Sequence, residues 1–61
     1  MNMNELPQDP VLLLSVVNTA LRDRFPTLER FCAAQGCDQN ELVEKLKAID
    51  YVYDPSQNRF V

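Results

Sequence analysis

Apolar and polar positions recur along the first half of the chain with the period of an α-helix. Asp9-Pro10 is a helix start signal, because aspartate caps free backbone N–H groups and proline already has the φ of the first helical turn. Good helix formers without glycine follow as far as Arg24, and Pro26 prevents the helix from continuing through Phe25. The pattern therefore predicts a helix from Pro10 to about Arg24.

Two shorter helices are expected after this point. Thr27 is a typical N-cap for a helix from Leu28 to Gln35, and Gly36 stands where helices end with a positive φ. The segment 38–41 then repeats the start signal as a capping box, with Asp at the N-cap and Glu three residues later. A third helix is predicted from about Gln39 to Ile49. Its apolar positions at helical spacing are Leu42, Val43, Leu46 and Ile49.

After Asp50 the pattern changes from helical to extended. Tyr51-Val52-Tyr53 is β-prone, residues 54–57 have turn composition, and residues 58–61 can return as a partner strand. Because an isolated two-stranded hairpin is marginal in water, its aromatic residues are expected to pack on the helices. The expected fold is mainly α, a three-helix, helix-turn-helix-like domain with a short, wing-like C-terminal β-hairpin. Residues 1–61 form a single small domain in which residues 1–8 are a flexible tail.

The first predicted helix carries a wider apolar face than a small domain needs. At roughly 100° per residue its apolar side chains fill about 180°, whereas a helix covering a small core needs about 100°. One interpretation is that Leu6 and the aromatic residues of the hairpin fold back over the excess. The other is an uncovered contact surface, which predicts a homodimer through this helix because small proteins most often associate symmetrically. The candidate interface residues are Leu13, Leu14, Val16, Val17 and Leu21.

The polar side of the same helix carries Ser15, Asn18, Thr19, Arg22 and Asp23. The simpler interpretation is a solvated face on which the arginine and the aspartate form a local ion pair of little energetic value. A recognition stripe for a partner protein is the alternative.

Composition and charge narrow the function classes. The 61 residues are 46% hydrophobic and 25% charged, as in ordinary globular proteins. The net charge of −3 weakens any attraction to nucleic acid or anionic lipid. No apolar run approaches the roughly 18 residues of a membrane-spanning helix, and no basic residue precedes the first apolar stretch as in a secretory signal. A cytoplasmic protein is therefore expected.

Catalytic and metal-binding residue types are scarce. There is no histidine to activate a hydroxyl or thiol, and a single glycine cannot build a phosphate-binding loop. We therefore expect no enzyme activity, no catalytic residue, no cofactor and no metal site. Cys32 and Cys37 are too few for a disulfide framework, so two reduced thiols are expected, with Cys32 in the core. A redox or metal role for the pair is the alternative.

The helix-turn-helix layout of residues 28–49 also supports a second hypothesis, a winged helix-turn-helix regulator of transcription that binds DNA through its third helix. The charge argues against it, because residues 38–50 hold four acidic side chains and two lysines, a local charge of −2. An unidentified protein partner is therefore expected in preference to nucleic acid. The candidate contacts under the DNA hypothesis are Gln39, Asn40, Lys45 and Arg59.

Two segments carry a family resemblance. The stretch LPQDPVLLLSVVNTALRD at residues 6–23, with Tyr51-x-Tyr53-Asp54 and Asn58-x-Phe60 near the other end, resembles the DUF4250 family of short bacterial proteins. The resemblance covers nearly the whole chain and implies a bacterial, intracellular, single-domain protein. Members often have Gly where this chain has Asp50, so a departure is expected at the turn between the third helix and the hairpin. The family is a domain of unknown function, so the resemblance transfers no catalytic or binding role.

Overall fold

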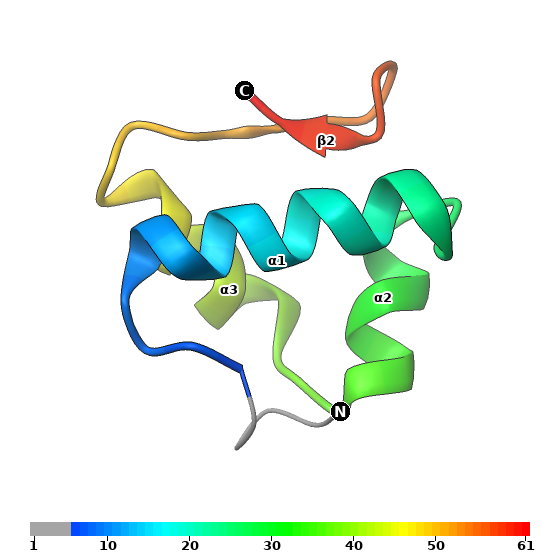
Figure 1. Ribbon diagram of the computed structural model, residues 1–61, viewed down its shortest axis with the longest axis horizontal. Coiled ribbons are helices and arrows are strands. Elements are labelled where there is room, and N and C mark those ends of the chain that lie inside the picture. Colours follow the sequence, from blue (N-terminus) through cyan, green and yellow to red (C-terminus); the bar gives the residue numbers. More distant parts are fainter. Residues whose placement is uncertain (1–5) are drawn as a thin grey trace.

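The computed structural model describes residues 6–61 and contains three helices followed by a β-hairpin (Figure 1). The helices are α1 (Pro10–Asp23), α2 (Leu28–Gln35) and α3 (Gln39–Lys47). The strands β1 (Tyr53–Asp54) and β2 (Arg59–Phe60) pair in antiparallel orientation. The predicted mainly α fold with a C-terminal hairpin is confirmed.

Each helix begins at the residue that the sequence predicts as its N-cap. The side chains of Asp9, Thr27 and Asp38 each accept a hydrogen bond from a backbone N–H in the first turn of the helix that follows. These bonds satisfy N–H groups that have no partner inside the helix. Gly36 ends α2 with a φ of 69°, so this prediction is confirmed too.

The end of α3 differs from the prediction. The helix stops at Lys47, two residues before Ile49, because the chain turns at Asp50 with a φ of 67°. The Asp50 N–H donates to the Lys47 carbonyl (2.9 Å), and the Tyr51 N–H donates to the Leu46 carbonyl (3.0 Å). This is the Schellman motif, in which glycine usually holds the left-handed position. An aspartate there adds a strained Cβ and places a negative charge at the negative end of the helix dipole.

We therefore expect Asp50→Gly to raise the free energy of unfolding by about 1 kcal/mol, since glycine removes both penalties. Urea unfolding followed by circular dichroism measures the change. Gly36→Ala is the matched control with the opposite expected effect. No atom lies within 4 Å of the added Cβ, so the positive φ alone should lower the free energy of unfolding by about 1 kcal/mol. An Asp50→Gly protein no more stable than the parent would contradict this account of the turn.

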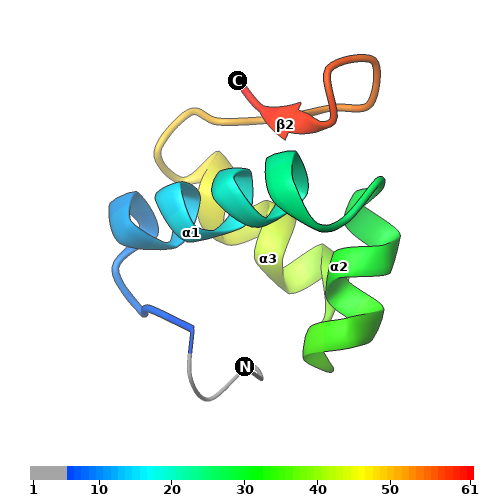
Figure 2. The same cartoon turned by 45° about the vertical axis from the view of Figure 1, so that its right-hand side comes forward.

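The hairpin is shorter than predicted but continues past its strands. Tyr53 faces Phe60 across the pair, with ring centroids 5.5 Å apart. Beyond them, Val52 and Val61 exchange two backbone hydrogen bonds of 2.9 Å, although neither residue belongs to a strand. The hairpin runs along one side of α1, with α2 and α3 on another side (Figures 1 and 2). Phe60 is fully buried, so the hairpin packs on the helices as expected.

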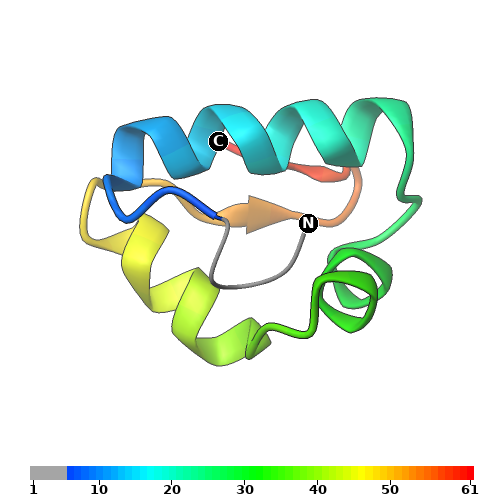
Figure 3. The ribbon, with the colours of Figure 1, turned by 60° about the horizontal axis from the view of Figure 1, so that its bottom comes forward.

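The core combines side chains from all three helices, from β2 and from the segment before α1. Seen from below, α1 lies on one side of the fold, with α3 and α2 opposite it (Figure 3). Leu6 is only 4% exposed, so the predicted flexible tail does not extend to this residue, and its residues 1–5 lie outside the described part of the chain. The buried apolar residues are Leu6, Leu13, Val17, Ala20, Leu21, Leu28, Phe31, Cys32, Leu42, Leu46 and Phe60.

Most of the wide apolar face of α1 lies in this core. Leu13, Val17 and Leu21 are at most 3% exposed, so three of the five candidate interface residues are core residues of the single chain. Leu14 and Val16 are half-buried and pack against the same core. The physical reason is that Leu6 and Phe60 of the hairpin cover this face, as the first of the two interpretations of the sequence expects.

Candidate functional site

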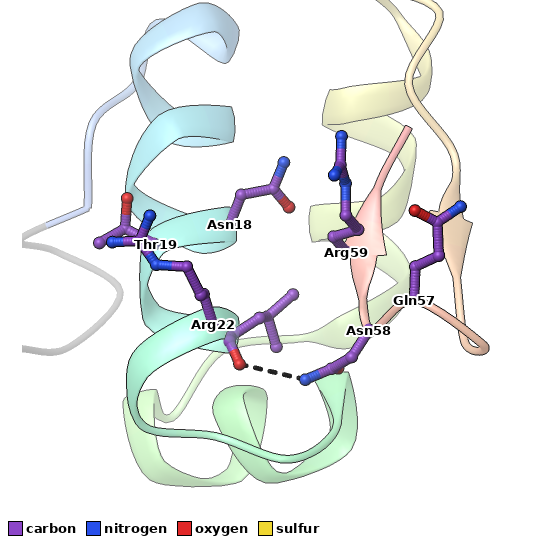
Figure 4. Close-up of a pocket in the computed structure, with 7 residues that line it drawn as sticks. Asn18, Thr19, Arg22, Gln57, Asn58 and Arg59 are labelled. Atoms are coloured by element: carbon purple, nitrogen blue, oxygen red, sulfur yellow. Dashed lines mark hydrogen bonds between the residues drawn. The ribbon is translucent and has the colours of Figure 1, made fainter.

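The hairpin loop is bound to the junction of α1 and α2 through Asn58. Asn58 has a φ of 52°, a left-handed conformation that asparagine tolerates better than most residues. Its Nδ2 donates to the carbonyl oxygens of Leu21 (3.1 Å) and Phe25 (2.9 Å). Figure 4 shows Asn58 reaching from the loop to the first of these carbonyls. The loop thus satisfies the Leu21 carbonyl in the last turn of α1, where carbonyl groups lack helical partners, and the Phe25 carbonyl in the segment that follows.

Tyr53 extends this connection to α2. Its hydroxyl donates to Oδ1 of Asn58 (2.7 Å) and accepts a hydrogen bond from the Leu28 N–H (3.3 Å). That N–H belongs to the first turn of α2, where backbone donors lack helical partners. Both polar side chains are half-buried, and their hydrogen bonds are made inside the fold.

Asn18 holds β2 against α1. Its Nδ2 donates to the Phe60 carbonyl (3.1 Å), and its Oδ1 accepts a hydrogen bond from the Phe60 N–H (2.8 Å). One side-chain amide therefore pairs with Phe60 as a neighbouring strand would. The sequence pattern places Asn18 on the polar side of α1, as part of a solvated or recognition face, whereas in the structure it holds the hairpin. The only sequence signal was its place at the edge of the apolar face of α1.

Asp54 organises the turn of the hairpin. Its Oδ1 accepts hydrogen bonds from the Ser56 N–H (2.9 Å) and the Ser56 hydroxyl (2.7 Å), and its Oδ2 accepts from Gln57 Nε2 (2.9 Å). These bonds hold the pKa of the Asp54 carboxyl below its usual value, with the Ser56 bond the largest cause. This carboxylate is a turn residue, as the composition of residues 54–57 predicts.

Asn18, Tyr53, Asp54 and Asn58 all lie in the segments that carry the family resemblance. The sequence profile of a domain of unknown function (DUF4250) matches residues 7–60 of the chain. The chain belongs to this family. No protein with a curated description matches it, and no solved structure does. In this DUF4250 chain, Asn18, Tyr53, Asp54 and Asn58 serve the fold by the hydrogen bonds given above.

A polar groove of about 480 Å³ lies between α1 and the hairpin loop (Figure 4). Arg22 and Arg59 line it, but their side chains do not point toward one another in Figure 4. Arg22 binds its neighbour Asp23 (Nε–Oδ1 2.9 Å), and this hydrogen bond lowers the pKa of the Asp23 carboxyl. Both side chains are more than half exposed, so the predicted ion pair of little energetic value is present. The groove offers no cluster of converging charges.

A second groove, of about 430 Å³, lies between α1 and α2. Its apolar residues are Val16, Ala20 and Phe31, and charged residues of the last turn of α1 line it as well. Gln35 also lines this groove, is only 7% exposed, and its Oε1 has no hydrogen-bond partner. The remaining lining residues are Ser15, Thr19, Asp23 and Arg24.

The four DNA-contact candidates have different surroundings. Nζ of Lys45 donates to Oε1 of Gln8 (3.1 Å), so this lysine is engaged with the segment before α1. Gln39 lines a third groove with Pro26 and Pro55, whereas Arg59 lines the groove beside α1. Asn40 is exposed in the first turn of α3.

The part of the chain that the structure describes contains neither a metal-binding cluster nor a membrane-spanning helix. Residues 6–61 hold no group of three or more His, Cys, Asp or Glu side chains that could bind a metal ion. Over the same range, no helix is long and apolar enough to cross a membrane.

Both cysteines are free thiols, with Cys32 buried at 5% exposure and Cys37 half-buried. Burial raises the pKa of the Cys32 thiol to about 12, and the neighbouring Cys37 and Asp38 add to the effect. Because the thiolate is the reactive form, Cys32 is a poor nucleophile at neutral pH. The prediction that Cys32 is a core residue is confirmed.

The Cys32 pKa predicts a loss of stability at high pH. The folded-state value of about 12 exceeds the ordinary value of 9.0, so the folded state disfavours the thiolate. The stability that this provides is complete below about pH 9 and is lost as the pH rises towards 12. Urea midpoints measured under reducing conditions at several pH values test this. Cys32→Ala should cost about 1 kcal/mol at pH 7 but flatten the alkaline decline, and an unchanged decline would assign it to other groups.

Proposed function

We propose that this DUF4250 chain is a non-catalytic protein-interaction module that forms a homodimer through α1. The observation that carries the proposal is a pair of exposed aliphatic residues in the first turn of this helix. Val11 is 61% exposed and Leu12 is 58% exposed, whereas Ala20, eight residues after Leu12, is buried at 6%. Val16 is half-buried, lies four residues after Leu12 and lines the groove beside Phe31.

A binding role also agrees with how the polar side chains are used. The side-chain hydrogen bonds that join the hairpin to the helices come from Asn18, Tyr53 and Asn58. The buried thiol of Cys32 is held in its protonated form by its raised pKa. These side chains are therefore not free to act as an acid, a base or a nucleophile. This supports a role in protein binding rather than in catalysis.

The test is the molar mass in solution, measured by sedimentation equilibrium from micromolar to submillimolar concentration. We expect a monomer–dimer equilibrium that Leu12→Glu shifts to monomer. Glutamate in the first turn of a helix is favourable, so this change should leave the fold intact. Val52→Glu is the matched control, because Val52 is 56% exposed but lies outside α1, in the segment that pairs with Val61 beside the hairpin.

Two outcomes would contradict the proposal. One is a parent chain that stays monomeric at the highest concentration. The other is a dimer that Val52→Glu dissociates and Leu12→Glu does not, which would move the contact from α1 to the hairpin. Circular dichroism of each variant confirms that it is folded.

A further inference from the structure

We propose that Cys32 and Cys37 are a dithiol pair that a low-molecular-weight disulfide oxidises to an internal disulfide, with Cys37 as the residue that reacts first. Both residues are free thiols in the structure, which therefore describes the reduced form of the pair. The proposal assigns a modification site at the turn between α2 and α3. It does not depend on the proposed homodimer.

The turn at the end of α2 brings the two cysteines together. The Cys32 carbonyl accepts hydrogen bonds from the Gly36 N–H and from the Cys37 N–H, the second at 3.1 Å. Cys32 is the third residue before Gln35, the last residue of α2, and Cys37 is the second after it. Where a left-handed glycine ends a helix in this way, the side chains at these two positions frequently contact one another. The Cys37–Cys32 backbone hydrogen bond also keeps the two Cα atoms within the roughly 4.4–6.8 Å that disulfides span.

Burial makes the two thiols unequal. Cys32 is 5% exposed and belongs to the core, whereas Cys37 is half-buried and packs against that core. The neighbouring Cys37 is among the causes of the raised pKa of the Cys32 thiol, which agrees with the closeness of the two side chains. Because an attacking thiolate must be accessible, Cys37 is the thiol that a small disulfide in solution meets first.

The reaction proceeds by two exchange steps. The Cys37 thiol loses its proton and attacks one sulfur of the small disulfide, which forms a mixed disulfide on Cys37 and releases one small thiol. The Cys32 thiol then loses its proton and attacks Cys37 Sγ, which forms the Cys32–Cys37 bond and releases the second small thiol. The chain loses two electrons and two protons, and the small disulfide gains both as it becomes two thiols.

Equilibration of the full chain with mixtures of oxidised and reduced glutathione tests whether the fold favours this bond. Acid quenching, alkylation and mass spectrometry count the free thiols at each mixture. We expect a monomeric oxidised chain without free thiols. The equilibrium constant for its formation should be about tenfold larger in buffer than in urea that unfolds the chain, because a crosslink that fits the native geometry stabilises the folded state. Urea unfolding of the oxidised chain should then show the same tenfold gain in the folding constant.

The order of the two steps is tested with single variants. In Cys32→Ala, Cys37 should form the mixed disulfide with glutathione and stop there. In Cys37→Ser, the buried Cys32 should react with oxidised glutathione at least about tenfold more slowly. Asp50→Gly, added to both variants and to the parent, compensates for the stability lost at Cys32. Circular dichroism confirms that each protein is folded.

Three outcomes would contradict the proposal. An equilibrium constant no larger in the folded chain than in the unfolded one would mean that the fold holds the two sulfur atoms apart. A parent chain that accumulates the mixed disulfide and goes no further would mean that Cys32 does not reach Cys37. Equal rates for the two single variants would overturn the assignment of Cys37 as the first residue to react.

Discussion

Asn58→Ala is expected to lower the free energy of unfolding by about 3 kcal/mol. The change leaves the half-buried carbonyls of Leu21 and Phe25 and the Tyr53 hydroxyl without the hydrogen bonds that Asn58 provides. Each lost bond costs about 0.5–1.5 kcal/mol, because a half-buried partner can recover part of its hydrogen bonding from water. Alanine at a φ of 52° adds backbone strain of about 1 kcal/mol.

The measurement is urea unfolding in an Asp50→Gly background, which keeps the variant folded enough to give a baseline. A chain of this length has only about 3–9 kcal/mol of stability. Asn58→Gly separates the two causes, because glycine accepts the positive φ but makes no side-chain hydrogen bond. It should lie about 1 kcal/mol above Asn58→Ala. If both variants lose less than about 1 kcal/mol, the network contributes little to stability.

Asn18→Ala is expected to lower the free energy of unfolding by about 2–3 kcal/mol. The Phe60 N–H and carbonyl both lose their partner, and Phe60 is the fully buried residue of β2. Burying a backbone donor and an acceptor without partners costs about 1–3 kcal/mol each, less what water entering the gap restores. The hairpin should therefore loosen from α1 before the helices separate.

Amide hydrogen exchange measures whether the loss of stability is confined to the hairpin. The Phe60 N–H should exchange faster in Asn18→Ala by a larger factor than the core amides of α1 do. Thr19→Ala is the matched control, because Thr19 is the next residue on the same helix and its side chain is exposed. That variant should change stability by less than about 0.5 kcal/mol. Equal acceleration at every amide would mean that Asn18 supports the whole fold and not the docking of the hairpin.

The helix starts could be predicted from the sequence because their causes are local. Asp9 and Thr27 bond to N–H groups only two and three residues away, and Gly36 ends α2 by its own backbone freedom. The end of α3 was placed too late because the apolar period runs on to Ile49 while the backbone already turns. A left-handed Asp50 is an exception to the preference for glycine that marks such turns.

The cover of α1 and the roles of the two asparagines could not be decided from the sequence because their partners come from distant segments. Helical periodicity showed that Leu13 and Val17 share a face, but left open whether Leu6 and the hairpin cover that face, as Leu6 and Phe60 do. Asn18 bonds to a residue 42 positions later, and Asn58 to one 37 positions earlier. No local pattern carries that information. Once the hairpin is docked, the exposed aliphatic surface of α1 reduces to Val11 and Leu12.

The hydrogen bonds of Asn18 and Asn58 also affect the order in which parts of the fold can form during synthesis. α1 is made among the first residues, yet the side of it that carries Val17 and Leu21 is covered by Phe60, near the other end of the chain. Until residues 58–60 have been made and are free to fold back, α1 can form a helix but cannot dock the hairpin. The side of α1 that carries Val17 and Leu21 therefore stays uncovered longer than the sides that α2 and α3 cover, which makes it the last part of the core to close.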